Sequence, residues 1–177
     1  KRTAKRGDAA GDRFKSIENL LGSRLNDILT GDGKANLLAG GDGDDVLAGN
    51  GGDDTLVGGA GKDTLTGGEG ADVFLYTAAS DSTPAAPDMI KDFDGEGGDV
   101  LDLKAVDADT TKPGDQDFIF APGGFTGVAG EYHETLVGTV GTIQADTDGD
   151  KIADFKLTYI LVSPTTPSSY RGILPVN

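Results

Sequence analysis

The sequence predicts an all-β protein: a right-handed parallel β-roll of nine-residue repeats, capped by an antiparallel β region on its C-terminal side. Two observations predict this fold. The chain repeats with a period of nine between residues 22 and 75, and an apolar residue occupies the same position in every repeat. We expect a flanking linker at 1–19, the roll at 20–82 and the cap at 83–177.

Six consecutive repeats begin at Gly22 without a slip in register: GSRLNDILT, GDGKANLLA, GGDGDDVLA, GNGGDDTLV, GGAGKDTLT and GGEGADVFL. The sixth position is Asp or Asn throughout: Asp27, Asn36, Asp45, Asp54, Asp63 and Asp72. The eighth position is large and apolar: Leu29, Leu38, Leu47, Leu56, Leu65 and Phe74. A disordered Gly/Asp-rich linker is the alternative that composition suggests, but such a linker would not keep both patterns through six repeats.

Each repeat reads as a turn followed by a short strand. Glycines in the first positions permit the sharp turn, and positions seven to nine form the strand. The middle side chain of a three-residue strand points opposite to its neighbours, so position eight faces inward and Ile28, Val46, Thr55 and Thr64 face outward. A single short strand cannot bury its leucine. Successive repeats must therefore alternate between two facing sheets, which gives 18 residues per coil and three coils.

This alternation stacks the sixth-position residues in two columns, one on each edge of the roll. Parallel strands repeat about every 4.8 Å, and two carboxylates about 4 Å apart repel by roughly 4 kcal/mol at an effective dielectric of 20. Calcium accepts carboxylate and backbone carbonyl oxygens, both of which these glycine-rich turns offer, whereas magnesium requires a tighter octahedron. The sequence therefore predicts several bound Ca²⁺ ions.

Composition excludes other classes of protein. The 30 acidic residues, of which only 5 are Glu, give a net charge of −15, which opposes binding to nucleic acid. The chain has no cysteine and therefore neither disulfides nor thiolate metal sites. No apolar run approaches the roughly 20 residues of a membrane-spanning helix. The single histidine, His133, lacks a second histidine for a zinc motif, and no G-x-S-x-G nucleophile motif is present. We expect a non-catalytic module.

Repeats three, five and six match the nonapeptide G-G-x-G-x-D-x-U-x, and the fourth departs from it only at Asn50. These residues resemble the RTX (hemolysin-type) calcium-binding repeats of bacterial proteins exported by type I secretion. The following segment, SDSTPAAPDMIKDFDGEGGDVLDL, is similar to the C-terminal domain of serralysin-type metalloproteases and to the R-modules of mannuronan C5-epimerases. The resemblance implies an extracellular location, the type I secretion machinery as a partner, and a parent protein with its catalytic domain upstream.

The resemblance also implies which residues bind calcium, each ion lying between turns two repeats apart. One site would use Gly41, Gly43 and Asp45 with Gly58, Ala60 and Asp63. A second would use Asn50, Gly52 and Asp54 with Gly67, Glu69 and Asp72. The full predicted set is Asp27, Gly40, Gly41, Asp42, Gly43, Asp45, Gly49, Asn50, Gly51, Gly52, Asp54, Gly58, Gly59, Ala60, Gly61, Asp63, Gly67, Glu69, Asp72, Asp81 and Asp88.

The first two repeats depart from the pattern. Leu25 and Lys34 replace turn glycines and Asn36 replaces Asp, so we expect a weak or empty site between repeats two and four. Beyond the last repeat, Asp81 with Asp88 is expected either to close a site against Asp63 or, for Asp81, to cap a local turn.

After residue 88 the pattern changes to predicted hairpins: MIKDF and DVLDL around a DGEGG turn, then FIF, TLVGTVGTIQ and ADFKLTYILV. Asp146, Asp148, Asp150 and Asp154 resemble half of an EF-hand loop, but Lys151 stands where that loop needs Gly and Leu157 where it needs Glu, which favours a plain turn.

Three functions remain open. The first is a calcium-triggered accessory or secretion module that folds outside the cell. The second is an alginate-like polysaccharide-binding R-module, and the third is an adhesin repeat unit.

Overall fold

The computed structural model describes residues 3–5, 18–114 and 116–162, which form β structure with one 3₁₀ turn. The elements are β1 Thr3–Lys5, β2 Asn19–Leu21, β3 Ile28–Thr30, β4 Leu37–Asp42, β5 Val46–Gly51, β6 Thr55–Ala60, β7 Thr64–Glu69, β8 Val73–Leu75, η1 Ala79–Asp81, β9 Asp88–Phe93, β10 Val100–Asp102, β11 Ile119–Phe120, β12 Glu131–Val137, β13 Val140–Asp146 and β14 Phe155–Leu161. Within these ranges no helix has the length and apolarity needed to cross a membrane.

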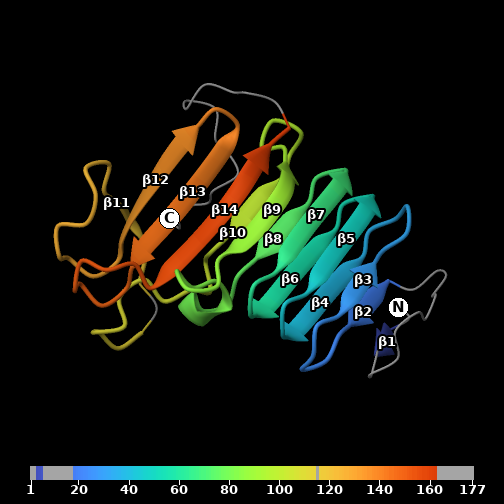
Figure 1. The fold of residues 1–177 in the computed structure, drawn as a ribbon, viewed down its shortest axis with the longest axis horizontal. Coiled ribbons are helices and arrows are strands. Elements are labelled where there is room, and N and C mark those ends of the chain that lie inside the picture. Colours follow the sequence, from blue (N-terminus) through green and yellow to red (C-terminus); the bar gives the residue numbers. More distant parts are fainter. Residues whose placement is uncertain (1–2, 6–17, 115, 163–177) are drawn as a thin grey trace.

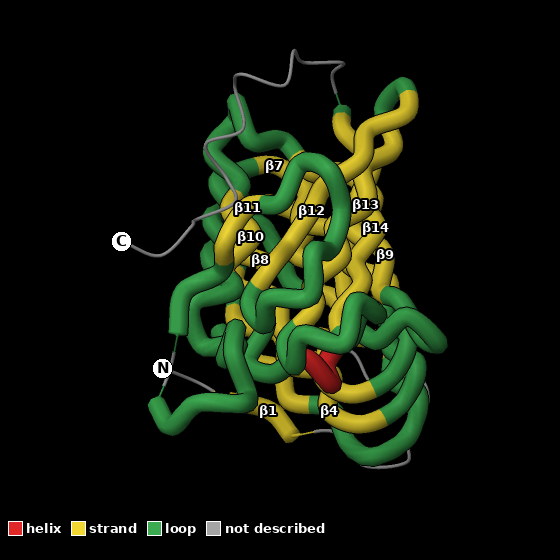
Figure 2. The backbone as a smooth tube through the Cα atoms, turned by 90° about the vertical axis from the view of Figure 1, so that its left-hand side faces the viewer, coloured by secondary structure: helices red, strands yellow, loops and turns green. Residues whose placement is uncertain are grey.

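Two sheets face each other along the roll (Figure 1). One has the order β1-β2-β4-β6-β8-β10 and the other β11-β12-β13-β14-β9-β7-β5-β3. Strands from successive repeats thus alternate between the sheets and pair in parallel with the strand two repeats away. Figure 2 shows the chain winding from one sheet to the other through loops. The predicted two-sheet parallel roll is confirmed.

The core of the roll is the column of eighth-position side chains. The completely buried members are Leu38, Leu47, Leu56, Leu65 and Phe74. On the outer face, by contrast, the seventh-position residue Ile28 is 65% exposed. Burying one such side chain contributes about 1.5–3 kcal/mol. The inward and outward assignment is therefore confirmed, and this column is the main source of stability in the coils.

Strands β4 to β7 are longer than the three residues expected. Each has six residues because the first positions of the next turn also pair, for example Gly41 with Gly59. The roll also has a strand before the first complete repeat: β2 pairs with β4, and its Leu20 is buried. Strand β1 lies in the segment expected to be a linker and pairs with β2.

The expected hairpin of MIKDF with DVLDL was wrong. Strand β9 pairs in parallel with β7 and β14, and β10 pairs in parallel with β8. The two strands thus belong to opposite sheets and add a fourth coil to the roll. The reason is burial: Ile90 and Leu101 lie beside Leu65 and Phe74 and extend the inner column, which a two-stranded hairpin would leave exposed.

The antiparallel part of the cap is β12-β13-β14, as expected from TLVGTVGTIQ and ADFKLTYILV. The hairpin expected of FIF was wrong, because β11 pairs in parallel with β12. It continues the eight-stranded sheet because β14 pairs with β9. Aromatic side chains close the end of the core: Tyr76 meets Phe155 edge to face at 5.4 Å between ring centroids, and Phe93 meets Tyr159 at 5.5 Å. This packing joins the cap to the roll.

Candidate metal centre

The sixth-position residues form two ladders of hydrogen bonds along the roll. In each rung a backbone N–H donates to Oδ1 of the aspartate in the next coil. The first ladder is Asp27 to Asp45 (2.7 Å), Asp45 to Asp63 (2.8 Å) and Asp63 to Asp88 (2.7 Å). The second is Asn36 to Asp54 (2.7 Å), Asp54 to Asp72 (2.8 Å) and Asp72 to Asp99 (3.0 Å). The predicted stacking in two columns is confirmed.

The second carboxylate oxygen of these aspartates is the notable feature. Oδ2 of Asp45, Asp54, Asp63, Asp72 and Asp88 is buried and accepts no hydrogen bond from the described part of the chain. A buried carboxylate oxygen without a partner costs free energy, and a cation is one group that can offset that cost.

In turns three to six, the glycine at position one lies directly against the free oxygen, so that no side chain fits there. A Cβ on Gly40 would overlap Oδ2 of Asp45 and lie 2.6 Å from the carbonyl oxygen of Gly58. The same arrangement recurs at Gly49, with Asp54 and the carbonyl of Gly67. A carboxylate and a carbonyl oxygen therefore converge on a space that a side chain would fill. These donors fit Ca²⁺, which binds such oxygens at 2.3–2.6 Å.

Positions two and four set the direction of the turn carbonyls. Both have positive φ in repeats three to six, as in Gly41 (113°) and Gly43 (117°). Their carbonyl oxygens point at the turn two repeats on, where a Cβ on Gly59 or Gly61 would collide with them. Asn50 takes this conformation without being glycine (77°), and its Nδ2 donates to the carbonyl of Gly31 at 2.8 Å. The fourth turn therefore keeps the geometry of its neighbours.

In the turns at both ends of the repeat region, the side-chain oxygen that is free in turns three to six is hydrogen-bonded. Oδ2 of Asp27 accepts the backbone N–H of Ser23 at 2.7 Å, and Oδ1 of Asn36 accepts that of Asp32 at 2.8 Å. Oδ2 of Asp81 accepts the N–H of Thr77 at 2.8 Å. In each case the residue at position two occupies the oxygen that stays free in turns three to six. The end turns are thus closed by their own backbone.

Turns that the resemblance pairs do lie against each other. The N–H of Gly43 donates to the carbonyl of Ala60, and that of Gly52 to the carbonyl of Glu69, both at 2.8 Å. The side chains of Asp42 and Glu69 are exposed, so these two residues offer the turns their main chain. Asp42 instead lies 4.0 Å from Arg24 at the surface.

Burial changes the acidity of the column residues. Desolvation raises the pKa of Asp45 and Asp54 to about 6 and that of Asp63 to about 7, and neighbouring carboxylates raise it further against the effect of the ladder N–H groups. Desolvation likewise raises the pKa of Asp88 to about 8. Without a cation, the folded columns therefore hold protons at a pH where free aspartate is ionised.

At the C-terminal end of the first column, the two predicted ligands Asp81 and Asp88 have different surroundings. Asp81 caps its own turn, with the backbone N–H groups of Thr77 and Ala78 on Oδ2. Asp88 takes the next rung of the ladder below Asp63, and its free Oδ2 is close to the buried phenol of Tyr76.

Sequence reasoning missed Asp99, which holds the matching place in the second column. Its Oδ1 accepts the N–H of Asp72, and its Oδ2 accepts the N–H of Asp94 at 2.8 Å. One signal was available: Asp99 precedes Val100 and Leu101, the same triplet as Asp45 with the two residues after it.

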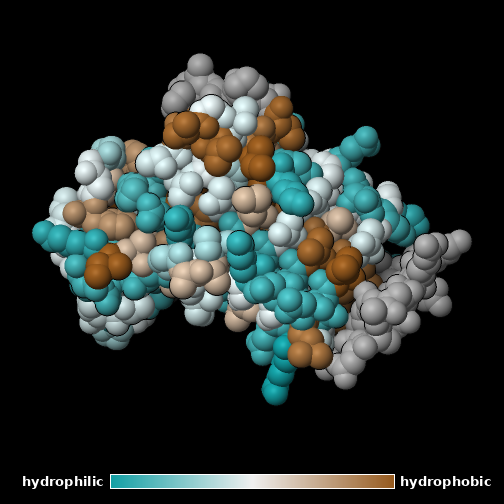
Figure 3. Space-filling view, viewed as in Figure 1, coloured by the Kyte–Doolittle hydropathy of each residue, from teal (hydrophilic) through white to brown (hydrophobic). Residues whose placement is uncertain are grey.

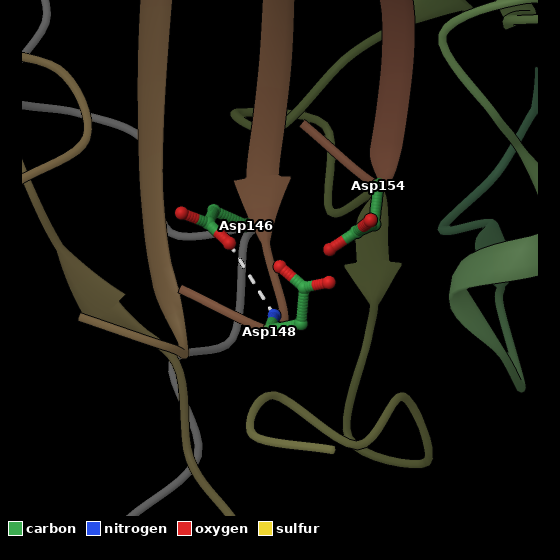
Figure 4. Close-up of side chains that lie close together, drawn as sticks. All are labelled: Asp146, Asp148 and Asp154. Carbon is green, nitrogen blue, oxygen red and sulfur yellow. Dashed lines mark hydrogen bonds between the residues drawn. The ribbon is translucent and has the colours of Figure 1, made fainter. Parts of the chain in front are cut away.

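The acidic turn between β13 and β14 is explained by its own hydrogen bonds. Carboxylate oxygens of Asp146, Asp148 and Asp154 lie within 4.8 Å of one another (Figure 4). Oδ1 of Asp146 accepts the N–H of Gly149 at 2.6 Å, and Oδ2 accepts that of Lys151 at 2.9 Å. Oδ2 of Asp154 accepts the N–H of Thr147 at 2.7 Å. The expected turn is thus held by backbone donors.

Away from the turns, the surface in Figure 3 is mixed, with brown areas over the β3–β5 end and near the β12–β13 tip. Exposed apolar residues there include Ile28, Val46, Val137 and Val140. The ring of His133 packs edge to face on Phe125, with centroids 4.8 Å apart.

Comparison with known proteins places the chain among domains of this architecture. The sequence model of the family described as "Peptidase M10 serralysin C terminal" matches residues 9–166. Metalloprotease AprA of Pseudomonas entomophila (strain L48) is 46% identical over 149 residues, which cover 82% of this chain but 28% of that protein. The chain thus spans just over a quarter of the length of this relative.

Among the solved structures similar to this chain are two subunits of a mannuronan C5-epimerase from Azotobacter vinelandii. The AlgE6R2 subunit superposes with a TM-score of 0.61 at 30% identity, covering 88% of this chain and 93% of that one. The AlgE6R3 subunit gives 0.57 at 27% identity, covering 87% and 80%.

Proposed function

Since this chain belongs to the serralysin C-terminal domain family of the M10 peptidases, we propose that it is a non-catalytic calcium-binding module of a secreted protein, and that calcium outside the cell makes it fold. The observation that supports this most is the set of buried, unpartnered Oδ2 atoms in turns three to six, each packed against the glycine at position one. A related metalloprotease and two epimerase subunits are consistent with an accessory domain of an enzyme.

The residues proposed to hold calcium come from pairs of turns in the same column. In the first column they are the carboxylates of Asp45 and Asp63 with main-chain oxygens of turns three and five. In the second they are Asp54 and Asp72 with those of turns four and six. Asp88 with Asp63 would hold a further ion at the C-terminal end. When bound, calcium supplies the positive charge that these oxygens otherwise lack.

Coupling between binding and folding follows from the electrostatics. The chain carries a net charge of −15, and each coil brings carboxylates together within the distance between neighbouring strands. An ion that binds the folded coils and not the unfolded chain stabilises folding by mass action. Because neighbouring coils share their aspartates, folding should be cooperative in calcium.

The difference in calcium concentration between the cytosol and the exterior would control when the chain folds. Extracellular calcium modules typically have dissociation constants of roughly 10⁻⁴ to 10⁻³ M. Sites of this strength would stay empty in the cytosol and fill outside the cell. An unfolded chain could then pass through type I secretion machinery and fold on exit.

A calcium titration of the whole chain tests this function. In excess chelator, circular dichroism should show little β signal and scattering should show an expanded radius. Millimolar calcium, but not equal magnesium, should produce compaction with a Hill slope above about 2. A compact, β-rich chain in chelator that calcium leaves unchanged would contradict the proposal.

A second function, contact with a polysaccharide, is favoured by the similarity to two subunits of a mannuronan C5-epimerase. The outer face of β9 and β14 carries Lys91 and Lys156, which could meet an acidic glycan. Titration of the calcium-loaded chain with oligomannuronate separates the two functions, since the calcium-module function alone predicts no saturable binding.

A further inference from the structure

Tyr76 stands where the repeating turns have glycine. It lies 18 residues after Gly58, at position one of a seventh turn that ends at Asp81. Position one faces the interior of the roll, since Gly40, Gly58 and Tyr76 are all buried. Tyr76 is only 1% exposed, and its ring meets that of Phe155 edge to face. A large side chain thus enters the interior at a place that glycine occupies in the earlier turns.

This ring reaches from one sheet toward the other. Tyr76 follows β8 of the six-stranded sheet, whereas Phe155 lies on β14 of the eight-stranded sheet. Leu157, two residues after Phe155 and also buried, is the register partner of Asp88 on β9. Asp88 is buried as well, like Ile90 on the same face of β9. The phenol of Tyr76 therefore lies in the same part of the interior as the Asp88 carboxylate.

The Tyr76 hydroxyl interacts with Asp88 without completing a hydrogen bond. Burial, followed by the charge of Asp88, raises the pKa of the phenol well above its usual range. Burial also raises the pKa of Asp88, and a side-chain contact with the phenol opposes that effect. Yet neither the Tyr76 hydroxyl nor Oδ2 of Asp88 has a partner in hydrogen-bonding geometry among the described residues. The two groups are neighbours whose polar atoms are still unsatisfied.

Three unsatisfied oxygens therefore lie at the end of the first column. They are Oδ2 of Asp63, Oδ2 of Asp88 and the hydroxyl of Tyr76, all on residues that are at most 1% exposed. The ladder rung from the N–H of Asp63 to Oδ1 of Asp88, at 2.7 Å, keeps the two carboxylates together. In the described part of the chain, no other buried hydroxyl lacks a partner. Unlike the aspartate pairs within the repeats, this pair has a spare hydroxyl beside it.

A hydroxyl can complete such a site by donating to a carboxylate. An ionised carboxylate only accepts, and each of its oxygens has more than one lone pair, so Asp88 can accept from the phenol and bind a cation at once. Carboxylates that bind metals are commonly held by hydrogen bonds of this kind. The usual calcium ligands are carboxylates, carbonyls and waters, not phenols. The role that fits the Tyr76 hydroxyl is therefore that of a donor to Asp88.

We infer that Tyr76 is a positioning residue of the terminal calcium site: its hydroxyl donates to the Asp88 carboxylate and holds it against the ion that Asp88 shares with Asp63. This inference rests on the proposed function and adds a residue outside the set predicted from the sequence. It also gives the seventh turn a part in the column. Oδ2 of Asp81 is occupied by backbone N–H groups of its own turn, so this turn contributes a hydroxyl in place of a carboxylate.

Native mass spectrometry of the whole chain at a series of free calcium concentrations tests this role. Tyr76→Phe removes the hydroxyl and keeps the ring against Phe155, so one ion should bind about tenfold more weakly while the others are unchanged. Tyr159→Phe is the matched control: Tyr159 is also buried, but its hydroxyl contacts Glu134 of β12, which belongs to neither column. This control should bind every ion as the wild type does.

A double variant separates positioning from packing. Asp88→Asn should lose one ion, and adding Tyr76→Phe to it should change nothing further at the remaining sites, because the carboxylate that the hydroxyl serves is gone. The double variant also covers the case in which Tyr76→Phe alone does not fold, since it removes the charge that the single variant leaves buried without its donor.

Three results would overturn the inference. Tyr76→Phe could bind all ions with wild-type affinity, or it could weaken the remaining sites in the Asp88→Asn background as well, which would mean that Tyr76 only packs in the core. An Asp88→Asn chain with the full number of ions would show that the terminal site does not exist. A wild-type chain that binds no calcium would instead overturn the proposed function.

Discussion

The backbone N–H of Asp63 donates to Oδ1 of Asp88 across 25 residues, whereas the earlier rungs of the same ladder join residues 18 apart. Seven extra residues are therefore accommodated between two consecutive rungs without breaking the column. They lie in the segment that contains η1, where Asp81 closes its own turn. The candidate metal column thus extends one coil beyond the periodic sequence.

The two columns should respond unequally to the loss of a sixth-position side chain. Asp63→Ala removes a free Oδ2 and should raise the calcium midpoint of folding by about tenfold or more. Asn36→Ala removes a side chain whose Oδ1 is occupied by the N–H of Asp32, so the midpoint should change little. Calcium titrations followed by circular dichroism measure both, and equal shifts would contradict the assignment of sites.

Asp81 should act as a turn cap, and Asp88 should act as a calcium ligand. Asp81→Ala removes a turn cap and should cost about 0.5–2 kcal/mol of unfolding free energy without changing the number of bound ions. Asp88→Asn should remove an ion, because Oδ2 of Asp88 is buried and unpaired within the described residues. Ion counts by native mass spectrometry distinguish the two, and the loss of an ion in Asp81→Ala alone would reverse the assignment.

The inner column should dominate the stability of the calcium-loaded roll. Leu56→Ala should lower the free energy of unfolding by about 2–5 kcal/mol, because this side chain is completely buried. Thr55→Ala, one position earlier on the outer face, should cost less than about 1 kcal/mol. Denaturant unfolding in saturating calcium compares them. Similar losses would mean that the two faces are wrongly assigned.

Acid should partly substitute for calcium. Folding raises the pKa of Asp63 from 3.8 to about 7 and that of Asp88 to about 8, mainly through burial. A raised pKa means that the folded state binds protons more tightly, so this stability is complete below the unfolded pKa and is lost as pH rises through the folded pKa. In chelator, we therefore expect more β signal at pH 5 than at pH 8.

The same linkage lowers the calcium that folding requires in acid, because protons already stabilise the folded columns, so the calcium midpoint of folding should rise as pH rises from 6 to 8. Asp63→Asn removes one of the titrating groups and should show a weaker pH dependence of the chelated state. A chelated wild-type chain with less structure at pH 5 than at pH 8 would show that the sign is wrong.

Much of the roll could be predicted because the residues that determine it lie close together in the sequence. A nine-residue unit contains its own turn glycines, its inward leucine and its sixth-position aspartate, and each coil repeats the same contacts. The burial of Leu38 to Phe74 and the two hydrogen-bonded columns follow from that period. The resemblance to a known family added the pairing of turns and the residues expected at each site.

Tertiary structure alone decided what happens where the period stops. The sequence around residues 88–103 suits a hairpin, yet β9 and β10 separate because Ile90 and Leu101 each bury against the open end of a different sheet. That choice places Asp88, Asp92 and Asp99 beside turns 25 to 27 residues earlier. Local sequence determined the repeating unit; the surface that the last complete coil left exposed determined which later residues would join it.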